Sequence, residues 1–244
     1  MDPDLLLYAL IGFIAQLVDS SLGMAFGSLS SSLLLSAGFP PHSLSATVHT
    51  AEIFGGGAAT ISHWRIKNID MDLFKKLAFP AVIGAILGIL LVTHFDNETL
   101  KPWLGLYFMI IGSLVVIKTL RPSLIRTIKT HRTTLGFIGG FLDAFGGAGW
   151  GEFVSSGLLL RGHEVRSAVG SLVAAEFAVS LTVSLVFFST AGIAHWPAIL
   201  ALSIGAITAA PLGAIICKKV PRIPLMLGVG TVIILVGLKT FSGV

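Results

Sequence analysis

The chain has 244 residues, of which 54% are hydrophobic and 11% are charged, whereas a soluble domain has about 25% charged residues. This composition excludes an ordinary soluble domain and predicts an integral membrane protein. The net charge of +4 comes from bases in short segments between apolar stretches, so it indicates orientation in a bilayer and no nucleic-acid partner. The single cysteine, Cys217, excludes an internal disulfide and a cysteine-based metal cluster.

Six apolar stretches, each near the ~20 residues that cross a bilayer, predict transmembrane helices. In chain order they cover residues 43–62, 73–93, 100–117, 165–189, 196–217 and 223–241. Two further apolar stretches, residues 5–36 and 133–160, are too long for one crossing and are interrupted by Gly and Ser.

The loop charges predict the topology. Lys and Arg collect in residues 65–76, 118–132, 161–166 and 218–222, which we expect in the cytoplasm. Threading the chain through these loops makes residues 5–36 and 133–160 re-entrant hairpins that enter from opposite sides. A broken helix that crosses once is the alternative for each. The hairpin interpretation leaves both termini outside.

An internal duplication relates the two halves. Residues 12–52 and 136–176 align without a gap at an offset of 124, and 14 of the 41 pairs are identical, against about three expected by chance. We predict an all-α membrane protein of two inverted repeats, each a broken-helix hairpin plus three transmembrane helices. Residues 1–120 form the first repeat, 121–132 a basic cytoplasmic linker, and 133–244 the second repeat.

The hairpin tips are the candidate substrate site. Both begin with an acid, Asp19 or Asp143, and are rich in small residues. Glycine lets a ligand approach the backbone, and a half-helix after such a loop presents free N–H groups, which suits an anion. Close helix packing is the alternative role for these glycines. The candidate binding residues are Ser20, Ser21, Gly23, Gly27, Ser28, Gly147, Gly149, Trp150 and Gly151, and Asp19 and Asp143 are expected to shape the tips.

Acids within the apolar stretches predict proton coupling or structural hydrogen bonding, because a charged carboxylate in hydrocarbon is costly. Glu52 and Glu176 occupy equivalent positions, and His49 lies one helical turn before Glu52, so these three residues are the candidate proton-coupling groups. His63 falls near a loop and is expected to be solvated. No metal-ligand spacing or enzyme motif occurs, so we expect no metal site, no cofactor and no catalysis.

The residues resemble the TauE/SafE sulfite-exporter-type permeases, also called the toluene sulfonate uptake permease family. The resemblance is carried by the duplicated runs at residues 12–23 and 136–147, followed by residues 33–42 and 158–166. It covers both halves and implies a bacterial or archaeal inner-membrane permease for small sulfur-containing anions. The family's usual run of glycines after the tip is replaced here by Met24, Ala25 and Trp150, among others, so only Gly23, Gly27, Gly147 and Gly151 carry over.

The sequence therefore predicts a secondary transporter in the lipid bilayer that binds a small sulfur-containing oxyanion between the tips and works by alternating access. A cation or metal transporter that uses the intramembrane acids, a passive anion channel and an intramembrane enzyme are the alternatives. Neither the residues nor the resemblance fixes the direction of transport or the oligomeric state.

Overall fold

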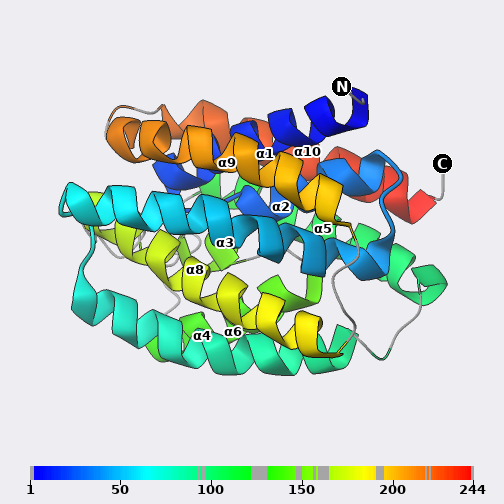
Figure 1. Ribbon diagram of the computed structural model, residues 1–244, viewed down its shortest axis with the longest axis horizontal. Helices are drawn as coiled ribbons and strands as arrows, with labels where there is room; N and C mark the ends of the chain where they lie inside the picture. The colour runs from blue at the N-terminus through cyan, green and yellow to red at the C-terminus, as the bar shows by residue number, and fades with distance from the viewer. Residues whose placement is uncertain are drawn as a thin grey trace.

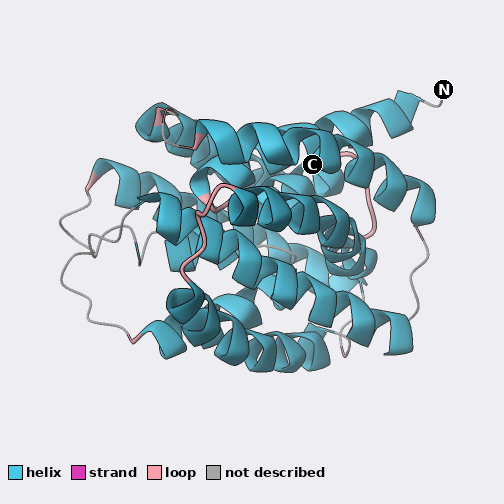
Figure 2. Cartoon of the chain, turned by 60° about the vertical axis from the view of Figure 1, so that its left-hand side comes forward, coloured by secondary structure: helices cyan, strands magenta, loops and turns pink. Residues whose placement is uncertain are grey.

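The computed structural model describes residues 3–92, 94, 97–121, 131–146, 150–155, 158, 165–190, 195–217, 219 and 221–242. This part of the chain is a helical bundle without strands (Figures 1 and 2). In order the elements are α1 (Pro3–Leu22), α2 (Phe26–Ser36), α3 (Pro41–Arg65), α4 (Met71–Val92), α5 (Asn97–Leu120), α6 (Arg132–Gly146), a π-helical turn η2 (Gly151–Ser155), α8 (Val165–Thr190), α9 (Trp196–Ile216) and α10 (Arg222–Ser242).

Six of the described helices are long and apolar enough to cross a membrane, namely α1, α4, α5, α8, α9 and α10. Five of them coincide with predicted spans. The sixth, α1, was expected to be a non-crossing hairpin arm, yet it has 20 residues and spanning composition. Helix α3, expected to be a span, has 25 residues but is not among the six, because its middle is rich in polar residues and glycine.

Glycine brings two pairs of helices into backbone contact. Along α1 and α9, a Cβ at Gly12 would fall on the carbonyl oxygen of Leu202. Along α6 and α4, a Cβ at Gly136 would fall 2.5 Å from the carbonyl oxygen of Leu77. Gly12 and Gly136 are equivalent in the duplication, so the same kind of close contact occurs once in each half. Any side chain at either position would push the helices apart.

The helix directions follow from which residues meet. Helices α1 and α9 are parallel, since Gly205 meets Ala9 and Gly213 meets Leu17. Helices α6 and α4 are also parallel, since Gly84 meets Phe137 and Gly88 meets Phe141. Helices α3 and α8 are antiparallel, because Thr50 lies 3.3 Å from Ser184, whereas residues further along α3 meet the start of α8.

Both chain ends lie at one end of the bundle, on the right in Figure 1. Helix α3 ends at the other end, where α4 and α8 begin (Figure 1). Seven described basic residues lie at or next to the helix ends that meet there: Arg65, Lys67, Lys75, Lys76, Arg132, Arg166 and Lys219. At the end that holds the termini, Lys239 of α10 donates a hydrogen bond to the carbonyl oxygen of Ser36, at 3.3 Å, where α2 ends.

Candidate functional site

The two helix breaks touch each other inside the bundle. Between α1 and α2 the chain takes positive φ at Gly23 (71°) and at Ala25 (93°), which reverses its direction. A Cβ at Gly151, just after the second break, would fall on the backbone of Met24. The hydroxyl of Ser155 donates to the carbonyl oxygen of Leu22 at 3.2 Å. The described residues that flank the two breaks are therefore in contact.

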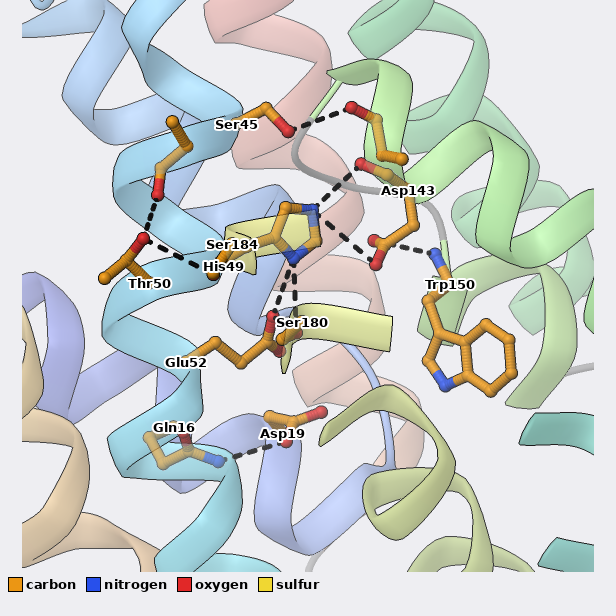
Figure 3. Close-up of polar contacts among 12 residues, drawn as sticks. Gln16, Asp19, Ser45, His49, Thr50, Glu52, Asp143, Trp150, Ser180 and Ser184 are labelled. Carbon is orange, nitrogen blue, oxygen red and sulfur yellow. Dashed lines mark hydrogen bonds and ion pairs between the residues drawn. The ribbon is translucent and has the colours of Figure 1, made fainter. Parts of the chain in front are cut away.

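A buried polar cluster joins α3 to α8 beside the breaks (Figure 3). The Nδ1 atom of His49 lies 3.3 Å from Oε2 of Glu52 and 3.2 Å from Oγ of Ser180. The Ser180 hydroxyl donates to the same Glu52 oxygen at 2.6 Å. His49 and Ser180 are fully buried and Glu52 is 2% exposed. One carboxylate oxygen thus receives contacts from both halves of the chain.

The other side of the His49 ring faces the end of α6. Its Nε2 atom is 3.2 Å from the carbonyl oxygen of Asp143. A carbonyl only accepts hydrogen bonds, so Nε2 carries a hydrogen, while Nδ1 faces Glu52 and Ser180. Ser45, one turn earlier on α3, donates to the carbonyl oxygen of Ala144 at 2.9 Å. Helix ends leave carbonyls without helical partners, and α3 supplies donors for two of them.

The Asp143 side chain spans the second break. Its Oδ1 atom accepts a hydrogen bond from the backbone N–H of Trp150 at 3.3 Å, and its Oδ2 atom lies 3.9 Å from Nε2 of His49. The carboxylate thus contacts the chain on the far side of the break.

The first break has its own polar network. Gln16 donates from Nε2 to Oδ2 of Asp19 and to Oγ of Ser20, both at 3.1 Å. All three residues are buried, with Asp19 1% exposed. The carbonyl oxygen of Ser20 lies 2.9 Å from Nε2 of His63, so this helix end is also held by a histidine of α3.

The other predicted binding residues are buried, but several side chains already have protein partners. The hydroxyls of Ser21 and Ser28 lie 3.0 Å and 3.5 Å from carbonyl oxygens one turn earlier. The indole N–H of Trp150 donates to the carbonyl oxygen of Leu172 at 3.3 Å, so it is engaged in the protein. Gly27 is buried in the first turn of α2 and Glu176 is buried in α8. Gly147 and Gly149 lie outside the described residues.

Sequence reasoning erred on His63 and missed Gln16 and Ser180. His63 was expected to be solvated, but it is fully buried, because α3 continues past it and the loop to α4 folds over it. Gln16 lies one turn before Asp19, and Ser180 one turn after Glu176. Spacing of three or four residues from a buried acid on the same helix was the signal that could have found both.

In the part of the chain that the structure describes, no three His, Cys, Asp or Glu side chains are placed to hold a metal ion together. The described polar contacts here are hydrogen bonds and close histidine–carboxylate pairs. Acids, hydroxyls and backbone amides surround the place where the two helix breaks meet.

Comparison with known proteins places this arrangement in a family. The family model described as Sulfite exporter TauE/SafE matches residues 8–240. The chain is 36% identical over 248 residues to the Probable membrane transporter protein YtnM of Bacillus subtilis, covering 97% of this chain and 82% of that protein. It is 30% identical over 165 residues to the Probable membrane transporter protein ORF9 of Sinorhizobium sp., covering 64% of this chain and 61% of that protein. It is 25% identical over 256 residues to the Probable membrane transporter protein YunE of Bacillus subtilis, covering 93% of each. With its six candidate spans, the chain is a multi-pass membrane transporter and belongs to the TauE/SafE sulfite exporter family.

Proposed function

We propose that this protein is a secondary transporter of small sulfur-containing oxyanions in the bacterial or archaeal inner membrane, and that the anion binds where the two helix breaks meet. The observation that carries the proposal is the contact between Gly151 and the backbone of Met24. Non-helical backbone at membrane depth persists only where it is buried in protein or lines an aqueous cavity. Two such segments in contact, one from each half, form a natural centre for alternating access.

Inverted repeats are the arrangement that the helix directions support. Helices α3 and α8 are equivalent in the duplication and run antiparallel, as two copies related by an axis in the membrane plane must. The equivalent pairs α1 with α9 and α6 with α4 are both parallel. Reporter fusions at the two termini test the orientation: both should read as external. One external and one cytoplasmic terminus would contradict the inverted repeat.

Hydrogen-bond donors rather than cationic side chains are the proposed ligands of the anion. Among the described residues around the breaks, the buried ionisable side chains are the acids Asp19, Glu52, Asp143 and Glu176, together with His49 and His63. An ionised carboxylate repels an oxyanion, whereas a protonated one donates a hydrogen bond to it. Protonation of Glu52 or Glu176 would therefore favour binding, and that links transport to a proton.

The contacts of Glu52 support it as the proton-coupling residue. Oε2 of Glu52 lies 3.3 Å from Nδ1 of His49 and 2.6 Å from the Ser180 hydroxyl. A proton on this oxygen would therefore lie beside both groups. No equivalent histidine faces Glu176, since residue 173 is Val. His49 thus gives one of the two symmetric glutamates a nearby proton acceptor.

Transport of labelled sulfite into proteoliposomes tests the function. We expect saturable uptake that is driven by an imposed pH gradient and inhibited by excess thiosulfate or sulfonate. A thermal-shift screen of the purified protein against sulfite, sulfonates and divalent cations accompanies it. Stabilisation by a cation without any by the anions would favour the cation transporter that the buried acids also suit. Uptake that never exceeds the external concentration under a gradient would indicate a channel.

A further inference from the structure

A second hydrogen-bonded network, away from Glu52, connects the first helix break to the second half of the chain. It starts at Arg166 in the first turn of α8, whose Nε donates to Oδ1 of Asn68 at 2.7 Å. Nδ2 of Asn68 lies 3.0 Å from Nδ1 of His63. Nε2 of His63 lies 2.9 Å from the carbonyl oxygen of Ser20.

Arg166 fixes which group donates in each hydrogen bond of this network. A guanidinium only donates, so the atom of Asn68 that faces it is the amide oxygen. The amide nitrogen of Asn68 then faces His63 and donates to Nδ1, which must carry a lone pair. His63 is therefore the neutral tautomer with its hydrogen on Nε2, and it donates to Ser20.

The hydrogen-bonded network is buried except at Arg166. His63 is fully buried and Asn68 is 1% exposed, whereas Arg166 is partly exposed at the basic end of the bundle. Gly170 of α8 leaves room for the backbone of Asn68, where a Cβ would collide. Ser20 is the residue after Asp19 in the last turn of α1, and its carbonyl would have no helical partner beyond the break.

We propose that His63 is a positioning residue for the first tip, and that Arg166 controls the tip from the surface by holding Asn68 and His63 in one hydrogen-bonding polarity. The proposal rests on the transport function proposed above, because it concerns the same site. It adds a contact between the halves that spans the basic end and must lengthen or break if α8 moves away from α3 there.

Hydrogen–deuterium exchange of the purified protein tests this without a substrate. His63→Leu should raise exchange in the peptide that covers residues 19–27 about tenfold, as expected for loss of one buried hydrogen bond. His63→Gln should stay within about twofold, because a Gln amide accepts from Asn68 and donates to Ser20 with the same polarity. If His63→Gln is as disturbed as His63→Leu, the side chain acts by shape alone and the proposal is overturned.

Arg166→Ala provides a second variant at a partly exposed residue, which keeps the test decisive if His63→Leu fails to fold. It touches no residue of the tip, yet it should raise exchange of the same peptide about threefold, since Asn68 becomes free to turn. The matched control is Arg132→Ala, a partly exposed arginine at the same end of the bundle, which should leave that peptide unchanged. An unchanged peptide in Arg166→Ala overturns the proposal.

Sulfite uptake by the same variants separates the two proposals. We expect the KM for sulfite to rise at least fivefold in His63→Leu and to recover in His63→Gln, with the maximal rate changed less than KM. If the wild-type protein does not transport sulfite but the exchange pattern holds, the substrate is wrong and the positioning role stands. If sulfite is transported and neither KM nor exchange responds to His63→Leu, the positioning role is wrong.

Discussion

Helices α3 and α8 occupy equivalent places in the two halves, yet only α3 holds both helix breaks by side-chain donors. They have 25 and 26 residues and carry the equivalent glutamates Glu52 and Glu176. Where α3 has Ser45, His49 and His63, however, α8 has Val169, Val173 and Phe187. The three residues of α3 contact carbonyl oxygens at the ends of α6 and α1, and the apolar residues of α8 have no side-chain donor to offer.

The backbone contacts, by contrast, are alike in the two halves. Gly12 meets α9 in the same way as the equivalent Gly136 meets α4. Packing between helices depends on the shape of both surfaces, so the two copies keep small residues at the same places. A polar anchor needs only one donor from one side. The packing of the helices is therefore symmetric between the two halves, whereas the hydrogen bonding is not.

The largest effect is expected where the two breaks touch. Gly151→Val should abolish transport with the protein still inserted, because a branched side chain would collide with the backbone of Met24. Gly228→Val is the matched control, since a Cβ at Gly228 meets open space. Proteoliposome uptake and membrane yield measure both. Normal uptake by Gly151→Val would remove the tip contact from the mechanism.

The two symmetric glutamates should differ when the carboxylate is neutralised. Glu52→Gln mimics the protonated acid, so it should keep sulfite exchange across liposome membranes. Its accumulation of sulfite under a pH gradient should fall at least tenfold. Glu176→Gln should lose less, because the position equivalent to His49 is Val173. Counterflow and gradient-driven uptake measured side by side check this. Equal losses in the two variants would mean that His49 does not set the difference.

The equivalent helix contacts in the two halves predict equal losses of stability when their glycines are replaced. Gly12→Ala and Gly136→Ala should each destabilise the protein by about 1–3 kcal/mol, the usual cost of overpacking, since the added carbon meets a carbonyl oxygen. Gly56→Ala should be nearly neutral, because its nearest neighbours would lie at ordinary contact distances of 3.5 Å or more. Thermal midpoints in detergent compare the three. A strong loss of stability in only one half would contradict the equivalence of the two helix contacts.

The smallest effect concerns a single hydrogen bond. Ser45→Ala removes the donor to the carbonyl oxygen of Ala144 and should cost about 1 kcal/mol. Ser189→Ala, an exposed serine whose hydroxyl bonds within its own helix, should cost less. The thermal midpoint again reports the result. If Ser45→Ala is neutral, water replaces the serine at the end of α6.

Most of the fold followed from the sequence because apolar length and loop charge are strong local signals. Five of the predicted spans match helices of spanning composition. The role of α1 was harder to predict, since glycines and serines within residues 5–36 indicate a break but not where it falls. The break comes at Gly23, late in the segment, and leaves α1 long enough to cross.

The candidate site was only partly predictable. His49 and Glu52 share a helix face by their spacing, and they lie together in the structure. The partners from other helices, Ser180 for Glu52 and the carbonyl oxygen of Ser20 for His63, depend on how the helices pack, which no local pattern encodes. His63 lies two residues before the end of α3, where sequence alone does not distinguish a buried side chain from a solvated one.

The bond from Lys239 to Ser36 bears on the charge of the site through the dipole of α2. A helix carries roughly half a positive charge at its N-terminus and half a negative charge at its C-terminus. Lys239 neutralises the negative end at the surface, whereas the positive end begins at Phe26, beside both breaks. Helix α2 is only ~16 Å long, so the negative end would otherwise cancel part of the field at the breaks. A surface lysine thus makes the potential at a buried site more positive without entering it.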